Sequence, residues 1–207
     1  MLHYQTIDSA VLELLKGLQQ LPVFSGMRLA GGTSLALQLG HRKSIDLDLF
    51  GVIESDELSV SKSLSAIGPL TLLNKTENIH IYLINDIKVD IVNYHYPWLE
   101  EALTENVLVL AGIKDIAAMK LAAITGRGTK KDFIDLYFLL KIFSLADMLG
   151  FYKQKFSDGS EFMVIKSLSY FEDADNEPGP VMIKPIGWED IRKLILDSLN
   201  KYLKESA

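Results

Sequence analysis

Two segments close together in the sequence, Gly31–Leu35 (Gly-Gly-Thr-Ser-Leu) and Ile45–Phe50 (Ile-Asp-Leu-Asp-Leu-Phe), decide how the rest of this chain is organised. The first predicts a glycine turn that opens a short helix. In the second, apolar residues that include Ile45 alternate with Asp46 and Asp48, the pattern of a strand with one buried face. A glycine turn followed by an Asp-x-Asp strand could hold a nucleotide and its magnesium ion.

The two aspartates lie two residues apart, so on a strand their side chains point the same way, with roots about 6.5 Å apart. Magnesium takes oxygen ligands, and carboxylates supply both the ligand and the balancing charge. Asp46 and Asp48 could therefore hold metal ions that polarise a phosphoryl group. The alternative is a solvated strand face on which polar residues simply alternate with core residues.

A third carboxylate stands on a second alternating segment, Ile87–Val92, which carries Asp90 on its polar side. If this strand lies beside the first, Asp90 joins Asp46 and Asp48. Like charges placed so close repel each other and are rarely gathered without a cation. The alternative is a polar edge strand on which Lys88 neutralises Asp90.

The glycine turn and the residues that follow it suit a phosphate. Gly31 and Gly32 would let a phosphate approach the backbone, and Thr33 begins a helix whose free N–H groups favour anions. Arg42 and Ser44, between the turn and the aspartate strand, add a guanidinium and a hydroxyl. Glycine pairs usually mark plain turns, so this feature gains its weight from its place before the aspartates.

A second basic group follows in the later part of the chain. Lys120 lies on a predicted helix, and Arg127 and Lys131 lie in the loop after it. The alternative is an exposed loop, in which cations simply favour the carboxyl end of the helix dipole. Asp132 could act in catalysis, or it could serve only as an acidic residue at the start of the next helix.

The coarse order of elements is a strand-rich first half and a helical second half, which predicts an α+β fold with a boundary near residue 97. An Asn85-Asp86 turn should join two strands in a hairpin. Predicted helices cover residues 7–21, 35–39 (ending at Gly40), 56–67 (capped by Ser55), 114–125, 132–143, 161–171 and 188–202, and a capping box at Ser144–Asp147 should open one more. Predicted strands cover residues 27–30, 45–50, 69–73, 79–84 and 87–92, and residues 172–180 should form a loop.

Composition narrows the classes of function. The 207 residues contain no cysteine, which excludes disulfides and thiolate metal sites. The net charge of −6 argues against broad, sequence-independent nucleic-acid binding. The first residues lack the pattern of a signal peptide, and no apolar run approaches the roughly 20 residues that span a bilayer. We therefore expect a cytoplasmic protein without a membrane partner.

Taken together, these motifs resemble the AbiEii/AbiGii toxin family of the DNA polymerase beta-like nucleotidyltransferase superfamily. The likeness rests on five ordered segments and one arginine: Gly31–Leu35, His41–Phe50, Lys88–Ile91, Ile113–Ala123, Arg127 and Lys131–Tyr137.

The resemblance implies a nucleotidyltransferase fold with a mixed β-sheet flanked by helices in residues 1–97, followed by a helical part in residues 98–207 that completes the active site. It implies these roles: catalytic residues Asp46, Asp48, Asp90, Lys120 and Asp132; metal ligands Asp46, Asp48 and Asp90, for Mg²⁺; and nucleotide-binding residues Gly31, Gly32, Thr33, Arg42, Ser44, Arg127 and Lys131.

The activity implied is magnesium-dependent transfer of a nucleoside monophosphate from a nucleoside triphosphate to an acceptor hydroxyl. The acceptor would be an RNA, in particular tRNA, and the partner an antitoxin protein. Two alternatives stay open from the residues alone: a small-molecule nucleotidyltransferase of the antibiotic-adenylylating kind, and a non-catalytic nucleotide-binding module.

Overall fold

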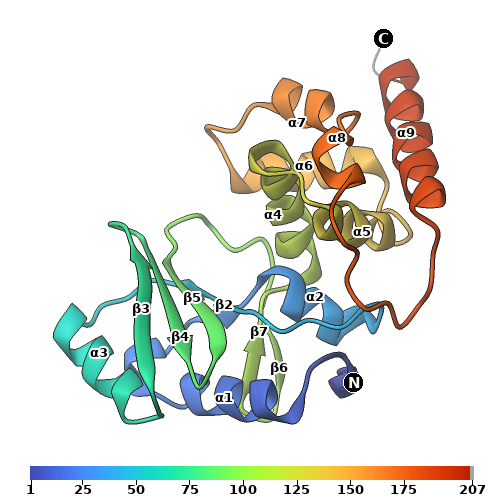
Figure 1. Cartoon of the computed structure of the whole chain (residues 1–207). Coiled ribbons are helices and arrows are strands. Elements are labelled where there is room, and N and C mark those ends of the chain that lie inside the picture. The colour runs from blue at the N-terminus through green and yellow to red at the C-terminus, as the bar shows by residue number, and fades with distance from the viewer. Residues whose placement is uncertain (206–207) are drawn as a thin grey trace. The chain divides into compact units, whose positions relative to one another are not determined.

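The structure, a computed structural model, describes residues 1–205 and divides into two compact units (Figure 1). The first unit comprises Met1–Tyr96 and Glu101–Ala111, and the second comprises Pro97–Glu100 and Gly112–Ala207. We predicted a change of character at residues 97 and 98. The structure places a later hairpin, within residues 101–111, in the first unit.

A mixed, seven-stranded sheet forms the centre of the first unit, in the order β3-β4-β5-β2-β1-β7-β6. Two neighbouring pairs, β2 with β5 and β1 with β7, are parallel, and the other pairs are antiparallel. The strands are β1 Arg28–Leu29, β2 Leu47–Gly51, β3 Leu70–Lys75, β4 Ile79–Ile84, β5 Ile87–Asn93, β6 Leu103–Glu105 and β7 Leu108–Leu110. This mixed sheet with flanking helices confirms the predicted α+β class.

Strand β2 shows why the aspartates face away from the core. Leu47 and Leu49 are fully buried, and Asp48 and Phe50 alternate with them on the other face. Ile45, which we expected on the buried face, is 64% exposed, because the strand begins only at Leu47. That prediction was wrong.

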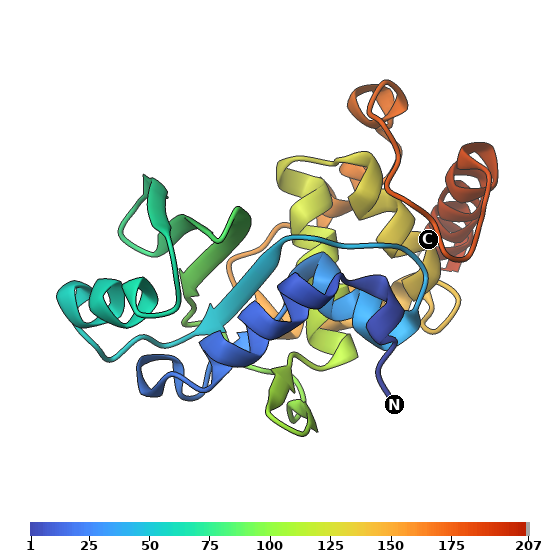
Figure 2. The ribbon, with the colours of Figure 1, turned by 60° about the horizontal axis from the view of Figure 1, so that its bottom comes forward.

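The helices of the first unit are α1 Ser9–Gln19, α2 Gly31–Leu39 and α3 Glu57–Ser65, with short 3-10 turns at Tyr4–Thr6 and Pro22–Phe24. Figures 1 and 2 show α1 alongside the sheet, and its apolar stripe joins the buried core. Helix α2 starts at Gly31, earlier than predicted, and stops at Gly40 as predicted, where a φ of 65° puts the backbone in the left-handed region. Asp56, not Ser55, caps α3 by accepting the N–H of Ser59.

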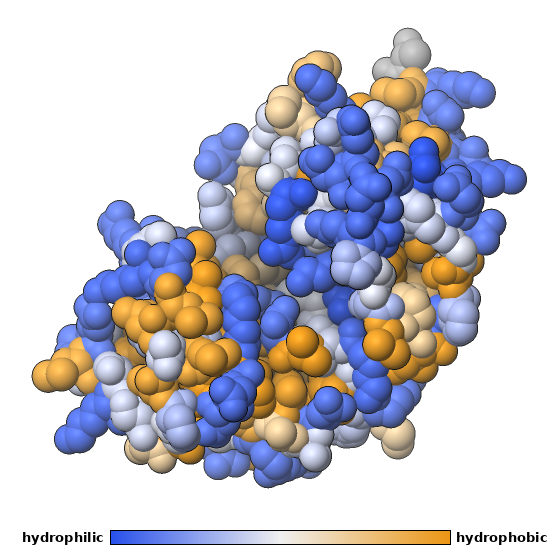
Figure 3. All heavy atoms as spheres, in the orientation of Figure 1, coloured by the Kyte–Doolittle hydropathy of each residue, from blue (hydrophilic) through white to orange (hydrophobic). Residues whose placement is uncertain are grey.

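The hairpin between β4 and β5 turns through Asn85 and Asp86, which both have positive φ, at 50° and 64°. Two left-handed residues in a two-residue loop match the twist of the flanking strands, so the predicted hairpin is confirmed. Beyond β4, the strand β3 closes the sheet with Leu72 and Leu73 exposed. Figure 3 shows apolar residues gathered over this end of the sheet.

The second unit is helical. Its helices are α4 Ile113–Gly126, α5 Lys130–Leu139, α6 Leu145–Lys155, α7 Glu161–Ser167, α8 Glu172–Asp175 and α9 Trp188–Glu205. The short helix α8 replaces the start of the predicted loop. None of the helices within residues 1–205 is long and apolar enough to cross a bilayer.

A buried ion pair ties the first residues of the second unit to its helices. Lys155 Nζ lies 2.6 Å from Asp115 Oδ1 and donates to the carbonyl of Pro97 at 2.8 Å. Asp115 also accepts the N–H of Leu99, and the Lys155 ammonium lies 4.5 Å from the centre of the Trp98 ring. These contacts fasten the segment 97–100 to α4 and α6.

Candidate active site

The first unit brings two of the predicted carboxylates side by side. Strands β2 and β5 run parallel, with Asp48 directly opposite Asp90. Neighbouring strands lie about 4.8 Å apart, so both side chains project from the same sheet face at close range. Asp46 lies two residues before Asp48, immediately before β2 begins. The pairing that the two alternating segments required is therefore present.

Gly31, the first residue of α2, lies directly against the side chain of Asp48. Its φ is +63°, and a Cβ added there would lie 2.2 Å from Asp48 Oδ2 and 3.0 Å from Asp48 Cγ. Only glycine fits this backbone conformation and this close approach. The Asp48 carboxylate thus rests at the amino end of α2, where the helix dipole favours negative charge.

Thr33 and Ser44 fasten the segment that leads into β2. The buried Thr33 hydroxyl donates to the carbonyl of Asp46 and lies 2.8 Å from the Ser44 hydroxyl. Two residues after Asp46, the carbonyl of Asp48 accepts the N–H of Ala30 at 2.9 Å. Two predicted nucleotide-binding residues therefore hold the backbone that carries the aspartates.

Arg42 is only 3% exposed, and its guanidinium folds back along its own loop. Nη1 donates to the carbonyl of Lys43 at 3.0 Å and reaches the Ser44 hydroxyl at 3.4 Å. These contacts join Arg42 to the Thr33–Ser44 pair. The predicted phosphate side of the site is thus one connected group of side chains around α2 and β2.

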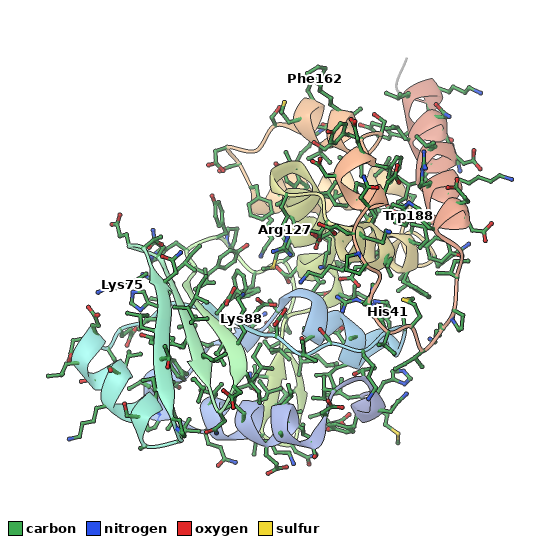
Figure 4. All side chains as sticks on the ribbon, in the orientation of Figure 1. His41, Lys75, Lys88, Arg127, Phe162 and Trp188 are labelled. Atoms are coloured by element: carbon green, nitrogen blue, oxygen red, sulfur yellow. The ribbon has the colours of Figure 1, made fainter. Side chains whose placement is uncertain are left out.

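Lys88 is the cation that faces Asp90. Both residues lie on β5, which Figure 4 shows with Lys88 labelled. Lys88 Nζ lies 2.7 Å from Asp90 Oδ1 and 2.8 Å from Asp90 Oδ2. Oδ1 is buried and accepts no well-directed hydrogen bond despite this short distance. The neutralising contact that the sequence offered as an alternative is therefore real.

The donor atoms of this face suit magnesium, because carboxylate oxygens from neighbouring strands are the ligands that hard cations prefer. Within residues 1–205, no three carboxylate or imidazole side chains are gathered closely enough to hold a metal ion. Both oxygens of Asp90 instead lie close to Lys88 Nζ, at 2.7 Å and 2.8 Å. The carboxylates are thus of the right chemical type to bind magnesium, but the Lys88 ammonium group occupies the space beside Asp90.

The second unit contains a buried ionic cluster built from predicted site residues. Lys120 Nζ lies 3.0 Å from Asp132 Oδ1 and 2.6 Å from Asp135 Oδ2, and all three residues are buried. Lys120 lies on α4, and the two aspartates lie on α5. The spacing of Asp132 and Asp135 by three residues puts them on one helix face.

Asp132 accepts hydrogen bonds from several further groups. Arg127 donates through Nε at 2.9 Å and Nη2 at 3.1 Å, and the Thr129 hydroxyl donates at 2.6 Å. Burial alone would raise the pKa of Asp132. The Lys120 charge, the Arg127 hydrogen bond and charge, and the Thr129 hydrogen bond outweigh burial and hold the pKa far below its usual range. Asp132 is thus an ionised anchor for two cations.

The loop before α5 presents the remaining predicted cations. The Arg127 side chain is 58% exposed, although it is held by Asp132 (Figure 4). Lys131 is half-buried in the first turn of α5. The Nζ of its neighbour Lys130 donates to the backbone carbonyl of Glu177 and lies 5.2 Å from the Trp188 ring centre.

The predicted site residues therefore fall into two sets. In the first unit lie Gly31, Gly32, Thr33, Arg42, Ser44, Asp46, Asp48 and Asp90, and in the second lie Lys120, Arg127, Lys131 and Asp132. Sequence reasoning gave no role in the site to Thr129 and Asp135. Thr129 stands three residues before Asp132 at a helix start, a spacing that could have indicated its contact.

Comparisons with known proteins show the family to which the chain belongs. A family model described as nucleotidyl transferase AbiEii toxin, Type IV TA system, matches residues 13–203. The uncharacterized protein aq_aa25 of Aquifex aeolicus (strain VF5) is 35% identical over 198 residues, which cover 93% of this chain and 95% of that protein.

Two crystal structures share the fold. JHP933 from Helicobacter pylori has a TM-score of 0.55 and 20% identity, and covers 97% of this chain and 96% of its own. A candidate nucleotidyltransferase from Helicobacter pylori has a TM-score of 0.57 and 19% identity, with 97% and 99% covered. With the family model spanning nearly the whole sequence, this chain belongs to the AbiEii family of nucleotidyltransferase toxins, and it is a nucleotidyltransferase.

Proposed function

We propose that this chain transfers a nucleoside monophosphate from a nucleoside triphosphate to an acceptor hydroxyl in a magnesium-dependent reaction. The observation that carries the proposal is the register that sets Asp48 opposite Asp90, with Asp46 two residues earlier. Magnesium held at these carboxylates would neutralise charge on the triphosphate and would polarise the reacting phosphoryl group.

In the reaction, the acceptor oxygen forms a bond to the α-phosphorus of the triphosphate. The bond from that phosphorus to the oxygen bridging the β-phosphate breaks, and pyrophosphate leaves. Asp90 serves either as a metal ligand or as the group that takes the proton of the acceptor hydroxyl. Asp46 and Asp48 would hold the metal.

The groups around α2 form the phosphate side of the proposed site. The free N–H groups of Gly31 and Gly32 are available at the first turn of a helix, where anions bind favourably. Thr33, Arg42 and Ser44 support these groups, because their mutual contacts fix the loop between α2 and β2.

In the second unit, Lys120, Arg127 and Lys131 are proposed to bind phosphate oxygens. Arg127 suits this role because its exposed guanidinium is oriented by Asp132. Asp132 orients Lys120 in the same way and thereby acts as a positioning residue.

The acceptor proposed is an RNA, in particular tRNA, and the partner an antitoxin protein, since the family is one of type IV toxin–antitoxin toxins. A small hydroxyl compound is the second candidate acceptor. The net charge of −6 favours it, because an RNA approaching an acidic protein meets repulsion.

The test is to incubate the protein with each labelled triphosphate and Mg²⁺, in parallel with total RNA and with a panel of small hydroxyl compounds. We expect label in an RNA band, and a labelled small compound would identify the second candidate. Asp46→Asn with Asp48→Asn should abolish transfer while the circular dichroism spectrum stays unchanged. The matched control is Asp86→Asn, at an exposed hairpin position where asparagine fits the left-handed backbone. Transfer retained in the folded double variant would overturn the proposal.

A further inference from the structure

We infer that Lys88 is an internal counter-ion of Asp90 that a metal ion must displace. Lys88 therefore weakens metal binding to the nucleotide-free protein and makes metal binding depend on the nucleotide. The inference rests on the proposed function, because it concerns a residue that would control metal binding at the third carboxylate, Asp90.

The contact is close and is built into one strand. Lys88 and Asp90 are two residues apart on β5, so they share a sheet face. Their charged groups approach to 2.7 Å and 2.8 Å. On the adjoining strand β4, the residues opposite are Leu83 and Ile81. The lysine thus has apolar side chains on that flank, and its charge is directed toward Asp90.

The ion pair leaves Asp90 with capacity for another ligand. Oδ1 of Asp90 is buried, and the ammonium 2.7 Å away gives it no well-directed hydrogen bond. The Asp90 carboxylate therefore keeps lone pairs that a metal ion could use. The Asp90 side chain is 20% exposed, so an ion can reach it from solvent.

Metal and ammonium compete because a divalent ion on Asp90 would lie within a few ångströms of a like charge. The displaced Lys88 then needs another anion. A triphosphate provides one, since lysine binds phosphate as a point charge. Nucleotide should therefore tighten metal binding, and metal should tighten nucleotide binding by the same factor.

The experiment measures Mn²⁺ binding by calorimetry and by electron paramagnetic resonance, without nucleotide and with a non-hydrolysable triphosphate. In Lys88→Met, whose side chain is unbranched, uncharged and only one atom shorter, the Kd for Mn²⁺ without nucleotide should fall about tenfold. We expect no larger change, because the Lys88 side chain is 40% exposed and solvent screens its charge. Lys88→Arg keeps the charge and should bind like wild type. The tightening caused by the triphosphate should be smaller in Lys88→Met than in wild type.

Lys75→Met is the matched control, because Lys75 pairs with Glu57 in the same unit and should leave the Kd unchanged. Equal Kd values for wild type and Lys88→Met would overturn the inference, provided that Asp48→Asn weakens binding and so marks the site. If neither wild type nor Lys88→Met binds Mn²⁺, the metal role in the proposed function fails, and the inference fails with it. Thermal unfolding of each variant shows that it is folded.

Discussion

Replacing Gly31 with alanine tests whether the first residue of α2 positions Asp48. The left-handed φ of +63° costs a residue with a side chain about 1–2 kcal/mol. The new methyl group would also lie 2.2 Å from Asp48 Oδ2, so something must move. Because the carboxylate is the end of a flexible side chain, it should move before the backbone does. We expect Gly31→Ala to destabilise the fold by about 1–2 kcal/mol and to displace a proposed metal ligand.

The control for Gly31→Ala is Gly26→Ala. Gly26 has a φ of +86°, and no heavy atom lies within 4 Å of the position an added Cβ would take. This variant therefore carries the backbone cost without the contact with Asp48. For a chain of this size, each kcal/mol lowers Tm by about 2–4 °C, so both variants should unfold a few degrees early.

Transfer of labelled nucleotide separates the two variants. Misplacing a catalytic group by about 1 Å can cost about 100-fold in rate, and Gly31→Ala should show a loss of this order. Gly26→Ala should transfer at the rate of wild type. If the two variants transfer equally well, the contact between Gly31 and Asp48 does not matter for the reaction, and our reasoning is wrong.

Two further predictions concern buried ion pairs. The folded-state pKa of Asp132 lies below its usual value of 3.8, so its stabilising effect is fully present above that pH and is lost as the pH falls toward the folded pKa. At pH 7, urea unfolding should give Asp132→Asn a free energy of unfolding about 3 kcal/mol lower than that of wild type. The difference should be smaller at pH 3, and a difference that does not change with pH would contradict this prediction. Lys155→Met should cost about 3–5 kcal/mol, because it leaves the Asp115 carboxylate buried without its cation. The double variant with Asp115→Asn should recover part of that loss, whereas an additive further loss in urea unfolding would contradict the pairing.

The sequence predicted the local structure of the aspartate strands well, because alternation of apolar and polar residues reports directly which face is buried. It could not establish that β2 and β5 are parallel neighbours. That pairing depends on the path of the chain through α3, β3 and β4, and alternation carries no information on which strand lies beside which. The prediction that Asp90 joins the other two aspartates therefore depended on β2 and β5 being neighbours, which only the structure shows.

The predicted secondary structure was wrong where specific hydrogen bonds outweigh the alternation of apolar and polar residues. Ile45 fits the alternation, but its neighbour Ser44 donates its N–H to the carbonyl of Thr6, and Thr33 binds the carbonyl of Asp46. These contacts hold the residues before Leu47 outside the strand. The hairpin of β6 and β7 was missed because its strands are very short, although Asn106, with a φ of 55°, is typical of its turn.

The candidate site divides into parts that the backbone fixes and a part that it does not. The register of β2 and β5 sets the spacing of Asp48 and Asp90, and Gly31 sets the closest approach of α2. Exchanging either carboxylate for an amide thus changes charge with little change in shape. Lys88, by contrast, is a long side chain that is 40% exposed, and its ammonium group is held by the ion pair with Asp90. Rigid carboxylates with a movable counter-ion can exchange an ammonium group for a metal ion without any rearrangement of the sheet.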